Sequence, residues 1–377
     1  DFDELVSDAT AELTGDEVLL ANLTGERTDF IRLNNTGVRQ AGTVDQRTLT
    51  VDLVEGRRHT AGSVRLSGDR SADRARVRSL IETLRDQRRL VAEDPFLCFN
   101  TEPVSTERIE RGSIPAPDAA LADILAAGRG RDLVGIYAAG DTFHGFANSL
   151  GQRNWFESTT FNLDWCFYLR ADKAAKNLYA GFHWDDDAFA AKIDWSAQQL
   201  TALGRDPIEL APGEYRTYLA PRAVEELIQL WSYSGAFGRR ALETRQTPLL
   251  RMQVDDARLS PSVTIIEDTA HGVAANFQSA GFLRPDAVPL VVDGAPVDTL
   301  VSPRSAEEYG VATNGATDGE YPQSVTIAPG SIPTTGVTDA LGEGLYVGNL
   351  WYTNFSDRAA CRTTGMTRFA PFWIDGG

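Results

Sequence analysis

The sequence predicts an α+β fold, on three observations. Short apolar stretches follow one another as hairpins, joined by turn signals such as Asp293-Gly294, which supplies the positive φ angles of a tight turn. Stretches with helical periodicity lie between groups of strands and do not alternate with single strands. Beyond Arg245 helical periodicity disappears and turn signals recur. We therefore expect two domains. Residues 1–220 form an α/β part with a mixed or antiparallel sheet, and residues 221–377 form a helix followed by a mostly antiparallel β part, barrel-like or a sandwich.

The N-terminal part is expected to contain four helices and a long sheet. Apolar residues recur at helical spacing at 1–13, from Ser71 to Pro95, at 118–127 and at 189–204. Ser71 is a good N-cap, and Pro95 stops the second helix. Residues 96–117 contain three prolines and are expected to form a loop. Strands are expected at 18–21, 28–33, 49–53, 58–66, 132–151, 155–170, 178–184 and 208–219.

The C-terminal part is expected to consist of short strands joined by loops. Residues 289–292 and the chain from Ala295 onward form the clearest hairpin, around Asp293-Gly294. Residues 303–322 are expected to form a loop because turn residues dominate them. Further strands are expected at 263–267, 324–328, 345–353 and 369–374.

Composition and charge exclude several classes of function. The net charge of −17 argues against non-specific binding of nucleic acid, which requires clustered Lys and Arg. Three isolated cysteines are typical of reduced thiols in a cytosolic protein, so we expect a cytoplasmic location. No apolar run approaches the roughly 18 residues of a membrane-spanning helix, so we expect no membrane partner.

No local metal or nucleophile motif is present. The four histidines are scattered, and the chain has no His-x-x-x-His, no G-x-S-x-G and no phosphate-binding glycine loop. The densest group of potential ligands is His183-Trp184-Asp185-Asp186-Asp187. Its spacing does not match an EF-hand loop, so we interpret it as the acidic start of the helix at 189–204, where negative charge is favourable.

The stretch Pro221–Arg245 is predicted to begin as an amphipathic helix. Proline suits the first helical position, and one apolar face follows at i, i+3, i+4 and i+7, made of Val224, Leu227, Ile228 and Trp231. The helix is followed by Ser-Gly-Ala-Phe-Gly-Arg at 234–239.

This stretch resembles the metal-binding helix of the TldD/TldE (PmbA) family of metallopeptidase-like proteins. TldD-type members carry His-Glu-x-x-x-His, often His-Glu-Ala-Phe-Gly-His, and its Ala-Phe-Gly matches residues 236–238. The first histidine then falls on Ser234, the glutamate on Gly235 and the second histidine on Arg239. Zinc needs imidazole, thiolate or carboxylate ligands, and a guanidinium has no lone pair to give. The resemblance therefore implies the TldE/PmbA type, with no zinc or other cofactor in this chain.

A second resemblance covers residues 344–368, where PmbA-type proteins have a Gly-Leu-Tyr/Leu-Val strand, a polar loop and a Thr-Gly-Met/Asp-Phe segment. The side chains of this predicted loop could line a peptide cleft or satisfy one another in a purely structural loop. They are Asn354, Ser356, Asp357, Arg358, Arg362 and Thr364. TldD-type members are understood to use a C-terminal cysteine as a further zinc ligand. Cys361 would be a lone ligand here and is expected to be structural.

The resemblance implies a partner role. TldD and TldE proteins pair, and the metal-bearing one cleaves peptides in an enclosed cavity. We therefore expect a non-catalytic subunit of a cytosolic TldD/TldE-type metallopeptidase that acts on unfolded or modified peptides, with zinc in a TldD-type partner. The chain would form a heterodimer with that partner or a homodimer. Two alternatives stay open: a stand-alone hydrolase with a site around Ser356, Asp357 and Cys361, and a regulatory or interaction protein of the gyrase-modulator type.

Overall fold

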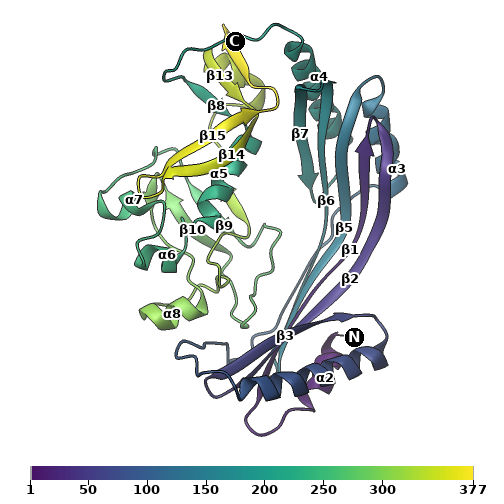
Figure 1. The fold of residues 1–377 in the computed structure, drawn as a ribbon, viewed down its shortest axis with the longest axis vertical. Coiled ribbons are helices and arrows are strands. Elements are labelled where there is room, and N and C mark those ends of the chain that lie inside the picture. Colours follow the sequence, from purple (N-terminus) through teal and green to yellow (C-terminus); the bar gives the residue numbers. More distant parts are fainter. Residues whose placement is uncertain (1, 377) are drawn as a thin grey trace.

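The computed structural model describes residues 2–376. Within them, a long seven-stranded sheet forms the N-terminal part, and sheets of four, three and two strands form the C-terminal part (Figure 1). Helices cover parts of these sheets. The predicted α+β class is confirmed, and the sheets of the described residues do not close into a barrel. The division at residue 220 stays a prediction.

The seven-stranded sheet is antiparallel except at one edge. Its order is β3-β2-β1-β5-β6, and β4 and β7 both pair with β6, β4 in parallel and β7 antiparallel. The strands are β1 (Val18–Asn34), β2 (Gly37–Glu55), β3 (Arg58–Leu66), β4 (Thr106–Glu110), β5 (Asp132–Asn148), β6 (Arg153–Arg170) and β7 (Lys173–Gly181). The two strands expected at 18–21 and 28–33 are one strand, because the polar residues between them pair continuously with β2 and β5. β4 lies in the segment that we expected to be a loop.

Two pairs of helices cover opposite ends of one face of this sheet. α1 (Phe2–Thr10) and α2 (Arg70–Arg88) pack against residues such as Leu19 and Leu49. α3 (Pro117–Gly128) and α4 (Asp186–Leu203) pack against Ile31, Tyr137 and Trp165. Leu19 and Ile31 are an even number of residues apart on β1, so both helix pairs lie on the same face of the sheet. The middle of that face, between the pairs, is left without a helix.

The helix boundaries in this part follow their capping residues. Asp69, not Ser71, caps α2, since its carboxylate accepts a hydrogen bond of 2.9 Å from the Ala72 N–H. The helix ends at Arg88, well before Pro95. Asp185 caps α4 with a hydrogen bond of 2.7 Å from the Ala188 N–H, and Asp186 and Asp187 lie in the first turn. The interpretation of this acidic group as a helix start is confirmed.

A buried ionic network joins α2 to the start of β1. The Glu17 side chain is 1% exposed, and its carboxylate accepts hydrogen bonds from Arg85 (2.8 Å), Arg88 (2.9 Å) and the Thr14 N–H (2.9 Å). Burial alone would raise the pKa of Glu17, but these hydrogen bonds outweigh it and lower the pKa to about 2 from an ordinary 4.5.

This lowered pKa predicts an acid-dependent loss of stability. The folded state holds fewer protons at Glu17 than the unfolded state, so the contribution is complete above pH 4.5 and is lost as the pH falls towards 2. Its size is about 3 kcal/mol. We expect Glu17→Gln to lower the free energy of urea unfolding strongly at pH 6 and much less at pH 2. The control is Glu4→Gln, because Glu4 pairs with Arg70 at the surface and should change little. A constant difference between Glu17→Gln and the parent at all pH values would contradict this role.

The C-terminal part contains three small sheets. The four-stranded sheet has the order β11-β10-β9-β12, and the hairpin around Asp293-Gly294 is confirmed. In the three-stranded sheet β13 lies between β16 and β8, and β14 and β15 form a separate hairpin. The strands are β8 (Thr217–Leu219), β9 (Ile265–Asp268), β10 (Ala287–Val292), β11 (Ala295–Pro296), β12 (Val325–Ile327), β13 (Glu343–Val347), β14 (Asn349–Asp357), β15 (Arg362–Arg368) and β16 (Phe372–Asp375).

The helices of this part are short except for the first. They are α5 (Pro221–Tyr233), α6 (Arg239–Glu243), α7 (Leu250–Val254), α8 (Pro303–Tyr309) and α9 (Val337–Leu341). α8 begins inside the segment that we expected to be a loop, where Ser302 caps it by accepting from the Ser305 N–H. Only the last three residues of the strand expected at 208–219 are extended in a sheet, as β8.

The two parts pack together through the other face of the long sheet. Phe277 lies in one apolar cluster with Leu20, Phe146 and Phe156 of the sheet. The Arg108 guanidinium lies 4.5 Å from the Phe156 ring centroid and donates to the carbonyls of Thr269 (2.6 Å) and Gly272 (2.7 Å). This arginine therefore ties the edge of the long sheet to the loop after β9.

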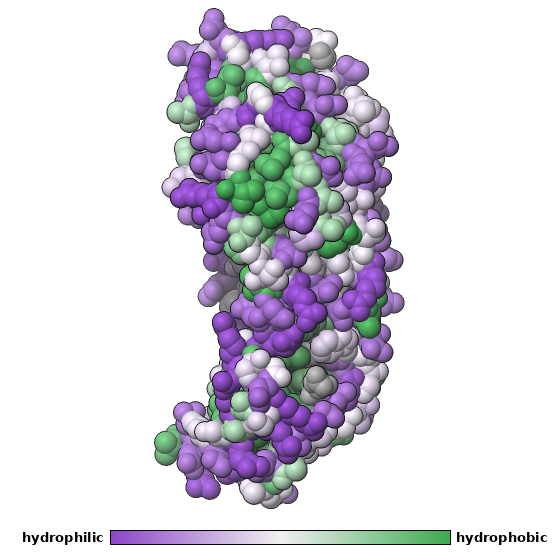
Figure 2. All heavy atoms as spheres, turned by 90° about the vertical axis from the view of Figure 1, so that its right-hand side faces the viewer, coloured by the Kyte–Doolittle hydropathy of each residue, from purple (hydrophilic) through white to green (hydrophobic). Residues whose placement is uncertain are grey.

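One face of the molecule shows how polar and apolar residues are distributed on the surface. The face in Figure 2 is mostly hydrophilic, with one hydrophobic area in its upper half, at the level of α3 in Figure 1. In the described part of the chain, no helix has the length and apolar character needed to cross a membrane.

Candidate functional site

The helix α5 ends at Tyr233, and its C-cap is Ser234, the position that corresponds to the first histidine of TldD-type members. Its apolar face is formed by buried Ile228 with Val224 and Trp231, and packs against the core of the four-stranded sheet. The Ser234 N–H donates to the carbonyls of Leu230 (3.2 Å) and Trp231 (3.1 Å), which completes the last turn. Gly235 then has a φ of +76°, in the left-handed region that terminates helices.

The helix breaks at Gly235, inside the segment that resembles the metal-binding motif of TldD-type members. A Cβ atom at residue 235 would lie 2.6 Å from the Cβ of Ala241. Ser234 is the C-cap of α5, and Arg239 is the first residue of α6. The positions that correspond to the two histidines therefore lie on different helices.

The Ala-Phe-Gly segment between these helices is part of the core. Ala236 and Phe237 are 9% and 3% exposed, and both contact the cluster that contains Leu249, Ile265 and Leu300. The Phe237 carbonyl accepts a hydrogen bond of 2.7 Å from the Leu300 N–H, and the Arg239 N–H donates to the Leu300 carbonyl at 2.9 Å. The Ala-Phe-Gly segment therefore has a structural role, in core packing and in backbone pairing with Leu300.

The side chain of Arg239, the first residue of α6, lies along this helix. Its guanidinium forms an ion pair with Glu243, one turn further along the helix, and its Nε is buried without a hydrogen-bond partner among the described residues.

The N-terminus of α6 is capped by a buried acid that the sequence did not reveal. Glu320 is 3% exposed and accepts from the Arg240 N–H (2.7 Å) and the Ser302 N–H (2.9 Å). Glu320 lies within residues 303–322, which we predicted to be a loop, and the residues around it show neither helical nor strand periodicity.

The predicted polar loop at 354–364 is a β-hairpin. Asn354 pairs with Thr364 and Asp357 with Arg362, so the turn is confined to residues 358–361. The Ser356 hydroxyl donates to the Arg362 carbonyl at 3.2 Å, and Asp357 accepts from the Ala360 N–H at 3.1 Å. All six side chains proposed to line a cleft are exposed: Asn354, Ser356, Asp357, Arg358, Arg362 and Thr364.

The tip of this hairpin contacts the end of α5. The Arg358 guanidinium donates to the Ser234 carbonyl. Cys361 packs against the apolar cluster that contains Ile228, Ala236 and Phe237, and burial raises the pKa of its thiol. The two stretches singled out in the sequence are therefore neighbours in space, through Ser234, Arg358 and Cys361.

The residues brought together here do not fit a zinc ion. Ser234 and Gly235 supply no imidazole or carboxylate, Arg239 is a permanent cation, and Cys361 is a single thiol. Among residues 2–376, no group of three or more His, Cys, Asp or Glu side chains is placed to hold a metal ion. One of the two alternatives is a hydrolytic site around Ser356, Asp357 and Cys361. The Ser356 hydroxyl donates to a backbone carbonyl, and no hydrogen bond between a histidine and Ser356 or Cys361 is formed in this part of the chain.

Comparison with protein families gives a match for the C-terminal part of the chain. Residues 212–377 match the family model of the PmbA/TldA metallopeptidase C-terminal domain. This part of the chain belongs to the PmbA/TldD family. The resemblance found in the sequence is thereby confirmed, and the α5–hairpin contact lies inside the PmbA/TldD domain. No curated protein is similar enough in sequence to match the chain.

Solved structures show that the PmbA/TldD fold extends beyond the matched domain. A proposed modulator of a DNA gyrase from Thermotoga maritima MSB8 superposes with a TM-score of 0.78 at 12% identity, over 100% of this chain and 89% of that one. TldE from Thermococcus kodakarensis gives 0.76 at 14% identity, over 99% and 88%. A proposed modulator of DNA gyrase from Bacteroides thetaiotaomicron VPI-5482 gives 0.73 at 14% identity, over 97% and 88%.

Proposed function

We propose that this chain is a non-catalytic, TldE-like subunit of a cytoplasmic TldD/TldE-type metallopeptidase that processes unfolded or modified peptides. The observation that carries the proposal is the break between α5 and α6. There Ser234, Gly235 and Arg239 replace the histidines and glutamate of TldD-type members, and Gly235 holds a backbone conformation unfavourable for other residues. The structural similarity to TldE from Thermococcus kodakarensis also supports a TldE-like role.

In this proposal the zinc resides in a TldD-type partner, where it would activate water for peptide hydrolysis. The chain contributes the hairpin β14–β15, whose exposed side chains are anchored to α5 through Arg358. These side chains would line the peptide cleft of a heterodimer with the partner, or of a homodimer. Exposed hydroxyl, amide and charged groups on one hairpin can hydrogen-bond an extended peptide backbone without selecting its sequence.

The test is elemental analysis combined with a peptidase assay, on the chain alone and mixed with a TldD-type protein. We expect far less than one zinc per chain and no cleavage of unfolded casein by the chain alone. The mixture should cleave casein, and a chelator should abolish the activity. One tightly bound zinc per chain in the isolated protein would refute the proposal.

A second candidate is a regulatory protein that binds gyrase. Two structures of the same fold are described as proposed modulators of DNA gyrase. With a net charge of −17, contact with the gyrase protein is favoured over contact with DNA. Co-purification with gyrase that is unaffected by DNA removal would favour this candidate over the peptidase subunit.

A further inference from the structure

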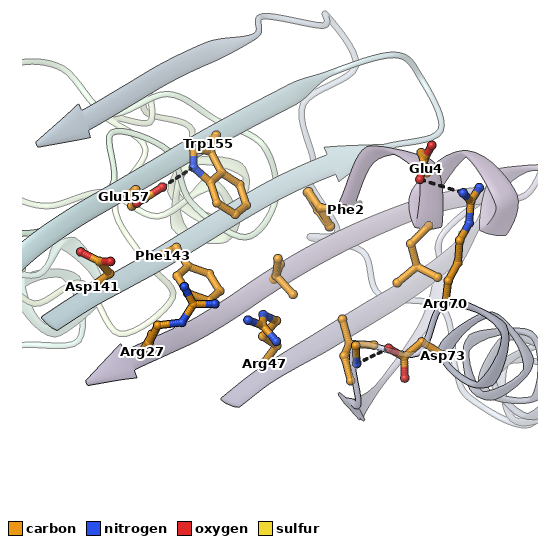
Figure 3. A pocket seen from close by; sticks show the side chains of 14 residues that line it. Phe2, Glu4, Arg27, Arg47, Arg70, Asp73, Asp141, Phe143, Trp155 and Glu157 are labelled. Carbon is orange, nitrogen blue, oxygen red and sulfur yellow. Dashed lines mark hydrogen bonds and ion pairs between the residues drawn. The ribbon is translucent and has the colours of Figure 1, made fainter. Parts of the chain in front are cut away.

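A large hollow lies in the N-terminal part, on the sheet face left open between the helix pairs α1/α2 and α3/α4. It measures about 580 Å³ and is lined by strands β1, β2, β5 and β6, with α1 and the start of α2 at one end (Figure 3). The site described above involves none of these elements.

The floor of the hollow is aromatic. The rings of Phe143 and Trp155 are stacked, with centroids 5.9 Å apart, and Phe2 of α1 lies 6.4 Å from Trp155. All three are partly exposed. Gly25 lies directly beneath Phe143, since a Cβ atom there would be 2.2 Å from the ring. The glycine therefore lets the phenylalanine ring lie against the β1 backbone, which leaves open space above it.

The walls of the hollow carry opposite charges. Arg27 and Arg47 project from β1 and β2 on one side, and Asp141 and Glu157 project from β5 and β6 on the other (Figure 3). The arginines share a single carboxylate, Asp45, at 3.4 Å and 2.9 Å. Because Asp45 carries one negative charge, it can neutralise only one of the two arginines. Glu157 is already paired with the exposed Arg111, whereas Asp141 has no ion pair among the described residues and accepts from the Thr159 hydroxyl at 2.6 Å.

The register of the strands places these groups in a row. Arg47 pairs with Gly25, Gly25 with Phe143, and Phe143 with Glu157, so all project from the same face. Neighbouring strands are about 4.8 Å apart, and the row from Arg47 to Glu157 therefore spans about 14 Å. Four residue steps of an extended peptide cover about the same length.

A second hollow adjoins the first. It measures about 530 Å³, shares Phe2 and Trp155 with the first, and is lined further by Ser105, Thr106 and Asn154. Together the two hollows offer more room than one side chain requires.

We propose that this face of the sheet binds an extended peptide that places an aromatic side chain on Phe143 and Trp155. An acidic residue of the peptide lies against Arg27 and Arg47, and a basic residue lies against Asp141 and Glu157. Stacking on exposed aromatic rings and complementary charge at the two walls supply the affinity. This inference goes beyond the proposed function, because binding here requires neither zinc nor a partner subunit.

The test is fluorescence anisotropy at low salt with the full chain alone and labelled, end-blocked pentapeptides. The probe is Asp-Gly-Phe-Gly-Lys, compared with Asp-Gly-Ala-Gly-Lys and Lys-Gly-Phe-Gly-Lys. We expect the probe to bind at least about 5-fold more tightly than either of the others, from one aromatic contact and one charge pair.

A variant with reversed charge distinguishes a specific effect on binding from a simple loss of folding, because it should strengthen the binding of one peptide and weaken that of another. In Arg47→Glu, the probe should bind about 5- to 10-fold more weakly, whereas Lys-Gly-Phe-Gly-Lys should bind more tightly than to the parent chain. Phe143→Leu should weaken both peptides. The matched control is Arg89→Gln, since Arg89 is exposed just after the end of α2 and pairs only weakly with Asp86 at 3.8 Å. Equal binding of all three peptides, no binding of any of them, or an unchanged preference in Arg47→Glu would overturn the proposal, whatever the outcome of the zinc and peptidase assays.

Discussion

Replacing Glu267 by leucine is expected to lower the free energy of unfolding by about 3–5 kcal/mol. The Glu267 side chain is 1% exposed and forms an ion pair with Arg284, which is 5% exposed. Its carboxylate also accepts from the N–H groups of Gln323 (3.0 Å) and Ser324 (3.1 Å). The leucine would leave a buried guanidinium and two backbone donors without this partner, and each loss destabilises the folded state.

The measurement is urea unfolding of the parent and the variant at pH 7, followed by circular dichroism. The control is Asp255→Asn, because Asp255 pairs with Arg251 at 3.3 Å where both side chains are more than half exposed. Such a surface pair contributes less than about 1 kcal/mol. If Glu267→Leu lost no more than Asp255→Asn, the buried pair would not be a determinant of stability.

Glu267 is also linked to the contact between the two parts of the chain. The loop after β9 receives hydrogen bonds from Arg108 at Thr269 and Gly272, and Arg284 donates to the Ala275 carbonyl at 3.1 Å. Arg284 thus supports from the C-terminal side the same loop that Arg108 contacts from the long sheet. The Glu267→Leu variant should therefore expose this loop to limited proteolysis before the rest of the protein unfolds.

The sequence predicted elements well where one face is buried. The apolar residues of α5 recur at helical spacing because one side of the helix packs against the C-terminal core. The hairpin around Asp293-Gly294 was likewise predicted because its turn requires positive φ, found at both residues.

The sequence was less informative where both faces of an element are exposed or polar. The middle of β1 lies between the two helix pairs, so its residues lack the alternation of a half-buried strand, and one long strand was read as two. The hairpin β14–β15 is exposed along most of its length, and its polar residues were read as a loop. The aromatic hollow was missed because Phe143 and Trp155 come together through strand register, and Phe2 reaches Trp155 from the distant helix α1.

At the candidate site the family resemblance and the backbone carry different information. The Ala-Phe-Gly match located the correct segment, since residues 212–377 form the family domain. In the structure the helix ends inside this segment, at Gly235, and glycine is a typical helix terminator. The glycine at position 235 explains the end of the helix, and the Ala-Phe-Gly match pointed to the family domain.

Restoring the motif with Ser234→His, Gly235→Glu and Arg239→His is expected to give no stoichiometric zinc site. Gly235 has a φ of +76°, and a Cβ atom at this position would lie 2.6 Å from that of Ala241. The two histidines would also sit on separate helices, and the Ser234 carbonyl is bound by Arg358. The matched control is the double variant Ser234→His/Arg239→His, which keeps the glycine.

We expect the triple variant to be less stable than the double variant by about 1–3 kcal/mol, from the strained backbone and the contact with Ala241. Zinc is measured by elemental analysis after dialysis, and by the shift of the unfolding transition when zinc is added, since a metal bound only to the folded state stabilises it. One zinc per chain together with a zinc-dependent rise in stability would show that α5 can extend through residue 239. The break at Gly235 would then follow from the residues present and not from the surrounding fold, and the chain would be a metal-site scaffold lacking only its ligands.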